Sequence, residues 1–324
     1  MRNALYIKLL ALVVLTGCSA GYTSRSSDVA YLIGPNGLEF ASASQNLADI
    51  EGRTFSVTVA RFVRDTDSGE GSIQVSEETV TLASGFTTGD TIDLTLSLDG
   101  EELTFVNGRA SMESGQSVWG YLNFTLDRPT IYSATGGFYS YEKYLDPSES
   151  DVFETEGYFA VGFQTDPSEI LEMSGPIEYR GEYHGFGQLL DTEGGLLNDE
   201  LQTNGLISIT VDFDSSSASG VLNGLFDPDG SADAYTMFFV DAALDGNSFA
   251  AAPDMVCAPG ATCTSATNLG GSFFGPAGDE ISGVIGFDET TEIAETTSRF
   301  IGAAGFSTTR HPEPPEVSEV SSTD

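Results

Sequence analysis

Residues 270–287, with the sequence GGSFFGPAGDEISGVIGF, decide the fold of this chain. Pro276 lacks a backbone N–H and cannot donate a hydrogen bond to a central strand ladder, so it belongs in a connection between strands. The glycines around Pro276 permit tight hairpin geometry, and the acidic residues Asp279 and Glu280 follow at once. The stretch therefore predicts two antiparallel strands joined by a short turn that contains Pro276.

A period-two pattern extends from this stretch through most of the chain. Apolar residues alternate with polar ones in short runs that are separated by Gly, Asp, Asn and Ser, as in antiparallel strands with one buried face. Examples are FSVTVARFV at 55–63, IDLTLSL at 92–98 and VWGYLNFTL at 118–126. The best helical candidates, at 44–52 and 166–173, are only about two turns long. We therefore predict an all-β fold.

The second half of the chain carries the more regular strand pattern. About eight strand candidates follow one another with short linkers, so neighbouring strands should pair as hairpins. They lie at 175–187, 205–213, 217–226, 235–244, 247–256, 268–276, 280–287 and 300–309. An even number of up-and-down strands can close on itself without leaving an exposed edge. The pattern predicts a closed, eight-stranded antiparallel barrel.

Residues 270–287 also resemble the most recognisable part of the transferrin-binding-protein-B-like β-barrel family. In that family an aromatic-rich strand ends in Gly-Pro, and a small acidic turn leads into a Gly-Val strand. The residues that match this pattern are Gly271, Phe273, Phe274, Gly275, Pro276, Gly283 and Val284. Residues 175–187 resemble the opening strand of the family's barrel, and residues 300–310 resemble its closing strand. The resemblance covers roughly residues 157–310.

The resemblance implies a domain organisation, because barrels of this family follow a β-rich handle region. Residues 29–165 are then a β-rich handle-like domain, and residues 166–310 are the eight-stranded barrel. Residues 29–165 do not match the family motif by motif, so an unrelated β-sandwich is an open alternative. Residues 311–324 are predicted to form a disordered acidic tail, because prolines and like charges leave nothing to bury.

The first seventeen residues have the composition of a signal peptide. Arg2 and Lys8 supply positive charge, and residues 9–15 form an apolar run well below the roughly 20 residues of a membrane-spanning helix. The run Leu15-Thr16-Gly17-Cys18 resembles the lipobox of bacterial lipoprotein precursors, in which the cysteine thiol takes a diacylglycerol group. The alternative is an ordinary signal peptide followed by a chance cysteine.

Cys18 is therefore the predicted lipidation site and membrane anchor, after removal of residues 1–17. Residues 18–28 are small and polar, which is typical of a flexible tether. Ser19 stands where an aspartate would favour retention at the inner membrane. We expect an outer-membrane, lipid-anchored protein, with exposure at the cell surface and a surface-export translocon as further expectations.

Net charge excludes one class of partner. The chain has 49 acidic and 12 basic residues and a formal charge of −37. Such a surface repels phosphate, so binding of nucleic acid through a basic patch is excluded. The same charge keeps an exposed protein soluble and can steer a basic partner toward it.

The two remaining cysteines, Cys257 and Cys263, fit a single disulfide. An exported chain meets an oxidising compartment, and the five residues between the cysteines can turn tightly. A two-thiol metal site is the alternative, but Cys-x₅-Cys is not a usual zinc spacing and neither histidine lies nearby in sequence.

Catalytic and cofactor motifs are not found in the sequence. The histidines are His184, in a strand-like context that predicts a wall or rim residue, and His311, in the predicted tail. No Gly-x-Ser-x-Gly elbow, Walker loop or zincin helix is present. The acidic run at 227–233 has a spacing that suits Ca²⁺, but it lacks the flanking helices and terminal Glu of an EF-hand, so a hairpin loop is favoured. We predict no catalytic residue, metal or cofactor.

Three functions from different classes remain open. The resemblance implies a surface protein that binds a protein or small ligand through loops of the barrel and handle. It names no ligand, because binders with this barrel take different partners and the loops that grip transferrin do not map onto this sequence. The alternatives are a structural or adhesive envelope lipoprotein without a defined ligand, and an envelope enzyme.

Overall fold

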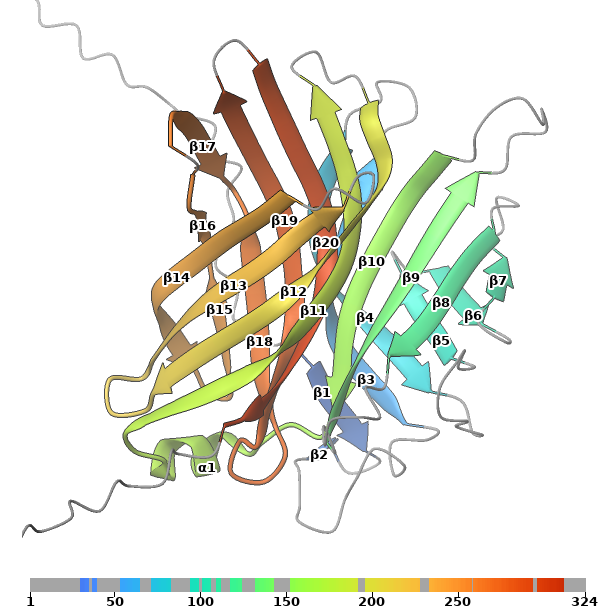
Figure 1. Cartoon of the computed structure of the whole chain (residues 1–324). Coiled ribbons are helices and arrows are strands. Elements are labelled where there is room, and N and C mark those ends of the chain that lie inside the picture. Colours follow the sequence, from blue (N-terminus) through green and yellow to red (C-terminus); the bar gives the residue numbers. More distant parts are fainter. Residues whose placement is uncertain are drawn as a thin grey trace, which may run out of the picture.

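The computed structural model shows two antiparallel β-sheets and one short helix (Figure 1). It describes residues 30–34, 37–39, 53–64, 71–82, 94–98, 101–105, 109–111, 117–123, 132–142, 152–191, 196–227, 233–257, 259–293 and 296–311. The prediction of an all-β fold is confirmed. The lipobox, the helical candidate at 44–52 and residues 312–324 lie outside the described residues.

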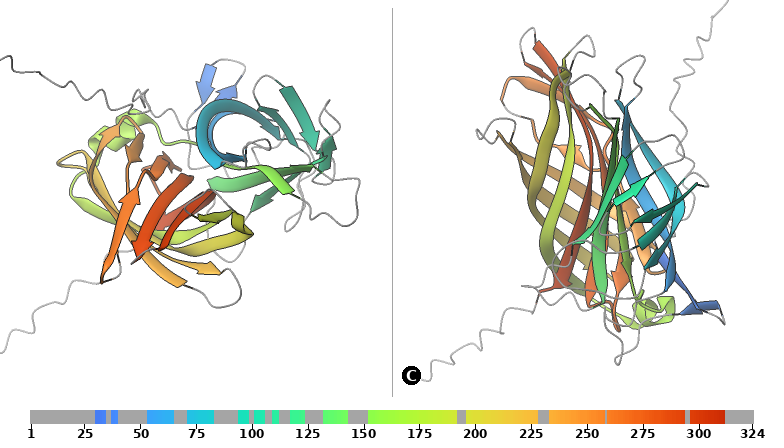
Figure 2. Two further views of the ribbon diagram at one scale, coloured as in Figure 1. Left: turned by 90° about the horizontal axis from the view of Figure 1, so that it is seen from above. Right: turned by 90° about the vertical axis from the view of Figure 1, so that its right-hand side faces the viewer.

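The first sheet is built by the strands that precede the helix, and we call it the handle sheet. Its strands are β1 (Ala30–Gly34), β2 (Gly37–Glu39), β3 (Thr54–Arg64), β4 (Gly71–Leu82), β5 (Leu94–Leu98), β6 (Glu101–Phe105), β7 (Arg109–Ser111), β8 (Ser117–Asn123), β9 (Ser133–Glu142) and β10 (Val152–Gly162). The order is β6-β5-β4-β3-β10-β9-β8-β7, with β1 pairing β2 and β3. One continuous sheet curves into a half-barrel (Figure 2), so the β-sandwich alternative is wrong.

Strand β3 of the handle sheet is buried on both of its faces. Val57 and Val59 point to one face of the sheet and Ala60 and Phe62 to the other, since side chains alternate along a strand. All four are buried. Ala60 packs with residues of the second sheet, and Phe62 packs against Ile301. A strand covered on both faces reads as a nearly continuous apolar run, as FSVTVARFV does.

The second sheet closes on itself. Its strands are β11 (Pro176–Asp191), β12 (Leu196–Asp212), β13 (Ser217–Asp227), β14 (Asp233–Asp245), β15 (Ser248–Ala251), β16 (Asp254–Met255), β17 (Ala261–Ser265), β18 (Asn268–Phe274), β19 (Glu280–Ile293) and β20 (Thr296–Arg310). Eight of them follow in the order β13-β12-β11-β20-β19-β18-β15-β14, and β14 pairs back with β13. The predicted eight-stranded antiparallel barrel is confirmed.

The structure divides the predicted strand at 247–256 into two strands, β15 and β16. Ala252 and Pro253 interrupt the pairing with β14, because proline has no N–H to contribute to the ladder. Strand β17 was not predicted. It extends the ladder of β19 beyond β18 in the same register, since Ser265 pairs with Glu289 and Asn268 with Gly286.

The barrel interior is filled by its own side chains. Phe273 lies in this core, with its ring centroid 6.0 Å from that of Tyr179 and 6.4 Å from that of Phe249. Phe274 points the other way, and a Cβ placed on Gly162 of β10 would lie 2.8 Å from its ring. The two rings occupy opposite faces, as adjacent residues of a strand must, and Pro276 lies just past the strand end, in the connection predicted for it.

One end of the barrel is covered by the helix α1 (Pro167–Glu172), at the position predicted from 166–173. The Asp166 side chain caps it by accepting hydrogen bonds from the backbone N–H and the hydroxyl of Ser168, at 2.8 and 2.7 Å. Ile170 is the buried residue of the helix and belongs to the barrel core. The helix therefore joins the two sheets in sequence and contributes to the barrel's interior.

Candidate functional site

The family motif lies where the handle sheet meets the barrel. After β10 the chain passes along the end of β18: the Thr165 N–H donates to the Phe273 carbonyl at 3.0 Å, and the Gly275 N–H donates to the Phe163 carbonyl at 2.9 Å. The Thr165 hydroxyl donates to the Gly275 carbonyl at 2.6 Å. The Gly-Pro turn is thus the point to which the segment leaving the handle is fixed.

Gly275 meets two requirements of this turn. Its φ is +80°, a conformation that side-chain-bearing residues rarely adopt. A Cβ at this position would also lie 2.4 Å from the Tyr132 ring, which packs over the turn. Glycine is therefore required here by backbone conformation and by close approach together.

The other motif residues belong to the same junction. Gly271 pairs with Gly283 across β18 and β19. A Cβ on Gly283 would lie 1.9 Å from the Gly270 carbonyl oxygen, so the two strands approach closely there. Val284 is buried against Ala60 of the handle sheet. These motif residues therefore serve side-chain packing and the close approach of β18 and β19.

A buried carboxylate on β19 also ties the two sheets together. Glu280 is 1% exposed and accepts a hydrogen bond from the Ser133 hydroxyl at 2.7 Å. The backbone N–H of Tyr132 donates to the same carboxylate at 3.2 Å, and Ser133 also bonds Ser282 at 2.7 Å. Charge-assisted bonds of this kind are among the stronger hydrogen bonds, so the start of β9 is held firmly to the barrel.

Strand β17 lies at the end of the barrel away from α1 (Figure 1), and its partner residue Glu289 on β19 is a second buried carboxylate. Glu289 on β19 follows the inward-facing Ile285 and Phe287 in register and is 2% exposed. One oxygen, Oε1, accepts hydrogen bonds from the hydroxyls of Ser265, at 2.6 Å, and Thr267. The other, Oε2, is buried without a hydrogen-bond partner among the described residues.

Burial raises the pKa of Glu289 to about 7, because the ionised form loses its hydration. The nearby carboxylates of Asp288 and Asp254 raise this pKa further, and the two hydroxyl donors act against the shift. A carboxyl group with a pKa near neutrality exchanges a proton under physiological conditions, so this end of the barrel contains a proton-binding group.

Tyrosine hydroxyls lie buried in the same barrel interior. The Tyr235 hydroxyl is 2.5 Å from that of Tyr183 and 2.6 Å from that of Thr203. Desolvation raises the pKa of Tyr183 to about 12, and it raises the pKa of Tyr235 well above its ordinary value, with Glu289 contributing to the second shift. Both tyrosines are therefore neutral hydrogen-bonding groups at physiological pH.

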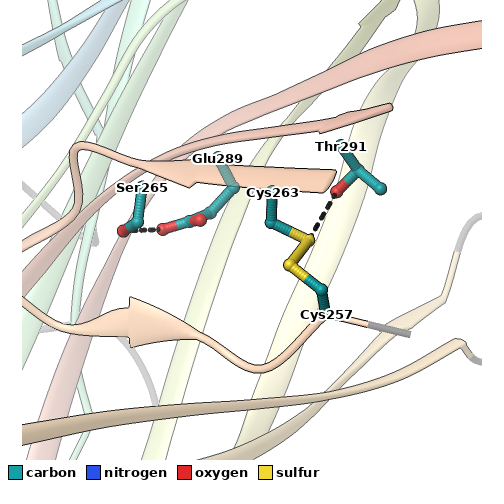
Figure 3. The surroundings of a disulfide bond; sticks show 5 residues. All are labelled: Cys257, Cys263, Ser265, Glu289 and Thr291. Carbon is teal, nitrogen blue, oxygen red and sulfur yellow. Dashed lines mark hydrogen bonds between the residues drawn. A yellow bond between two sulfur atoms is a disulfide. The ribbon is translucent and has the colours of Figure 1, made fainter. Parts of the chain in front are cut away.

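Cys257 and Cys263 lie at the same end: Cys257 follows β16, and Cys263 is part of β17. Their Cα atoms are 5.8 Å apart, a separation that a disulfide spans, and Figure 3 draws them as bonded. Thr291 of β19 lies beside Cys263, and Ser265 and Glu289 follow two pairs further along the ladder (Figure 3). The predicted cysteine pair and the buried carboxylate therefore occupy one region.

The remaining predicted positions are distributed over the surface. His184 is exposed on β11 with Nε2 3.9 Å from Glu182, which is the wall position expected. The backbone N–H of His311 donates to the Glu178 carbonyl at 2.7 Å, so His311 extends the barrel ladder, whereas it was expected to begin the disordered tail. The acidic run at 227–233 connects the paired strands β13 and β14, as expected of a hairpin.

The described part of the chain offers neither a metal-binding cluster nor a membrane-spanning helix. It contains no group of three or more His, Cys, Asp and Glu side chains that could hold a metal ion. Within the same residues, no helix is long and apolar enough to cross a membrane. Cys18 lies outside the described residues.

Sequence reasoning missed Glu289, although a signal for it was present. From Ile281 onward, every second residue of β19 faces the barrel interior, and this alternation reaches position 289. An acidic residue at an inward position is exceptional, because an ionised group loses hydration when it is buried. Its hydroxyl partners could not be found in this way, because β17 was not predicted.

Known proteins similar to this chain include a matching family model and several solved structures. A family model described as the C-lobe and N-lobe β-barrels of transferrin-binding protein B matches residues 171–306. A point mutant of transferrin-binding protein B from Haemophilus parasuis is 16% identical, with 81% of this chain and 47% of that chain covered and a TM-score of 0.42. The isotype 1 protein from serogroup B Neisseria meningitidis is 14% identical, with 80% and 44% covered and a TM-score of 0.37.

This chain spans less than half the length of these solved structures. Comparison with curated proteins finds no significant match. The family model covers the barrel from within α1 to the interior of β20, which includes every strand of the closed ring. Over residues 171–306, the barrel of this chain is therefore similar to the C-lobe and N-lobe β-barrels of transferrin-binding protein B.

Proposed function

We propose that this chain is a lipid-anchored outer-membrane protein that binds a protein or small ligand through loops of the barrel and handle sheet. The match of residues 171–306 to the barrels of a protein named for binding transferrin carries the proposal. Because this chain spans less than half of such proteins, the proposal names the ligand class and not transferrin itself.

Packing of the barrel favours the loops over the interior as the binding surface. The interior contains large aromatic side chains such as Tyr179, Phe249 and Phe273, all with no exposed surface. A small eight-stranded barrel can either be filled in this way or enclose one small ligand. Because the interior is filled, we propose that the ligand contacts the strand connections at the end of the barrel that holds Glu289 and Cys257.

Anchoring completes the proposal. The lipobox ending at Cys18 would place two or three acyl chains at the N-terminus, and each buried CH₂ contributes about 0.8 kcal/mol to membrane affinity. The tether at residues 18–28 would hold the two sheets outside the bilayer. Exposure on the outer leaflet would require a surface-export translocon as a partner during biogenesis.

Affinity capture of proteins and metabolites with the immobilised mature chain tests the proposal. The matched control carries Gly-Ser sequences of equal length in place of residues 228–232 and 258–260, the connections β13–β14 and β16–β17. We expect a ligand that binds saturably to the native chain and is lost from the control, while both proteins keep the same circular dichroism spectrum.

Two results would reject the proposal. Saturable binding to neither protein would favour the structural or adhesive lipoprotein. Conversion of a captured metabolite into a product would favour the enzyme.

A further inference from the structure

The outer wall of the barrel carries a cluster of exposed apolar side chains. Seven large hydrophobic residues are exposed among the described residues, and five of them lie on or beside β12, β13, β14 and β16. These five define what we call the apolar wall: Leu206, Val221, Phe238, Val240 and Val256. Their side chains are between 38% and 67% exposed.

Strand register makes the five residues neighbours. Val221 on β13 is the direct partner of Phe238 on β14, and directly opposed side chains have Cβ atoms about 5 Å apart. Leu206 on β12 is a diagonal neighbour of Val221 on β13, because the direct partner of Val221 is Ser208, two residues further along β12. The Val256 N–H donates to the Thr236 carbonyl at 2.8 Å, which places Val256 beside the same face of β14. The apolar wall is therefore one contiguous patch.

The middle of this part of the barrel is free of charge, although the chain carries 49 acidic residues. The outward positions there are Gln202, Asn204, Leu206, Ser208 and Thr210 on β12, Ser217, Ser219, Val221 and Asn223 on β13, and Thr236, Phe238 and Val240 on β14. None of these is ionisable, and the described outward-facing acids of the three strands, Asp212, Asp241 and Asp245, come only at the last residue of β12 and in the last five residues of β14. On the adjacent β11, by contrast, Glu178, Arg180 and Glu182 face outward.

The handle sheet covers a different side of the barrel. It packs on β11, β19 and β20 through residues that include Phe186, Val284 and Ala303, and Gly162 of β10 lies against Phe274 at the end of β18. Figure 2 shows the handle sheet on one side and the strands β12 to β14 on the side away from it. The described part of the chain therefore leaves the apolar wall open to solvent.

Acidic side chains border the wall. Asp254 lies directly opposite Phe238, and Asp241 follows Val240; both are exposed, and neither forms an ion pair with another described side chain. The cation on the adjacent strand β11, Arg180, is held by Glu178 through two hydrogen bonds of 2.8 and 2.9 Å. The surface thus combines an uncharged apolar centre with an unneutralised acidic border.

We propose that the apolar wall is a docking surface for a protein segment with an apolar centre and a basic border, such as a cationic amphipathic helix. Exposed apolar patches rimmed by polar groups mark interaction sites. The charge of −37 attracts a basic partner and disfavours a second acidic copy. This site is separate from the loop surface in the proposed function and does not depend on it.

Model peptides test the proposal with the whole mature chain. The probes are three amphipathic helical peptides of equal length, built from Leu with Lys, with Gln or with Glu on the polar face, and binding is measured by fluorescence anisotropy at about 0.15 M salt. We expect the Leu/Lys peptide to bind most tightly. Phe238→Ser and Val240→Ser should each weaken that binding by about tenfold, since each removes apolar contact area.

Variants at the acidic border and away from the wall separate the electrostatic contribution to peptide binding from the apolar one. Asp241→Asn combined with Asp254→Asn should weaken binding of the Leu/Lys peptide and reduce its salt dependence. Leu171→Ser is the matched control, because Leu171 is 82% exposed on α1, away from the wall, and it should leave binding unchanged. Val240 is more exposed than Phe238, so Val240→Ser tests the wall even where Phe238→Ser alters folding.

Several outcomes would overturn the proposal. The proposal fails if Val240→Ser and Leu171→Ser change the affinity for the Leu/Lys peptide equally. It also fails if the Leu/Gln and Leu/Lys peptides bind with equal affinity. Self-association in sedimentation velocity that is lost with Val240→Ser would assign the wall to a second copy of the chain. Binding to uncharged phosphatidylcholine vesicles that is lost with the same variant would assign it to a lipid surface.

Discussion

The hydroxyl of Ser265 donates a 2.6 Å hydrogen bond to the carboxylate of Glu289, across the β17–β19 ladder at one end of the barrel. Together with Thr267 it satisfies one oxygen of a carboxyl group that is 2% exposed. The hydrogen bond from Ser265 therefore links the position of the β16–β17 connection to the protonation of Glu289. The ladder also carries Cys263, so pH and cysteine chemistry act on the same segment.

Stability should fall as pH rises through neutrality. The folded pKa of Glu289, about 7, lies above the ordinary value of 4.5, so the folded state binds the proton more tightly than the unfolded chain. The contribution is fully present below pH 4.5 and is lost as pH rises through 7, by up to about 3 kcal/mol. Denaturant unfolding between pH 4.5 and 8 measures it. Glu289→Gln should flatten the dependence, whereas Glu292→Gln, exposed on the same strand, should not; equal slopes in all three proteins would contradict the assignment.

Cys257 and Cys263 should be joined after export. Closing so short a loop stabilises the fold by no more than about 2 to 3 kcal/mol, so a Cys257→Ser, Cys263→Ser double variant should remain folded with a modestly lower melting temperature. Peptide mass spectrometry without reduction should detect the cross-link. Two free thiols in the exported protein would count against the pair.

Membrane attachment should depend on Cys18. Cys18→Ala should appear in the soluble fraction, because no acyl chain can then be added, and the native protein should incorporate labelled palmitate. The lipobox interpretation fails if Cys18→Ala stays with the membrane and the native protein takes up no label.

Gly275→Ala should destabilise the junction between handle sheet and barrel. The residue has φ +80°, and its new Cβ would meet the Tyr132 ring at 2.4 Å. Gly260→Ala is the matched control, with φ +87° and no neighbouring atom within 4 Å. The control should lose about 1 to 2 kcal/mol from conformation alone, and Gly275→Ala should lose more in the same urea titration. Equal losses would show that the Tyr132 contact is unimportant.

Residues 166–311 should fold without the handle sheet. The fragment contains every strand of the closed ring and retains Ile170, which packs into the core. Its circular dichroism should be β-rich, and it should dissolve without detergent. Because it exposes Val284 and Ala303, which the handle sheet covers, we expect a lower melting temperature than that of the full chain. A helix-rich or detergent-dependent fragment would argue against an independent barrel.

Much of the barrel could be predicted because its information is local. Alternation through residues 280–287 and the proline at 276 define a strand, a turn and the side that each residue faces. The helix at 166–173 could be named as a candidate for the same reason, because its pattern is contained in about two turns of the chain. The pairing of β3 with β10 in the handle sheet was not predicted, because it joins segments that lie far apart in the chain. Alternation within a strand does not indicate which strands become neighbours.

The sequence by itself determined the fold class and the barrel, because these follow from local alternation and from turn residues. The same alternation implies the inward position of Glu289, although this position was not predicted. Only the tertiary structure decided that Ser265 and Thr267 meet that carboxylate and that Leu206, Val221 and Phe238 form one patch. Each of these residues is ordinary in its own strand. Their effect depends on strand register, and register is set by packing and hydrogen bonding across the whole sheet.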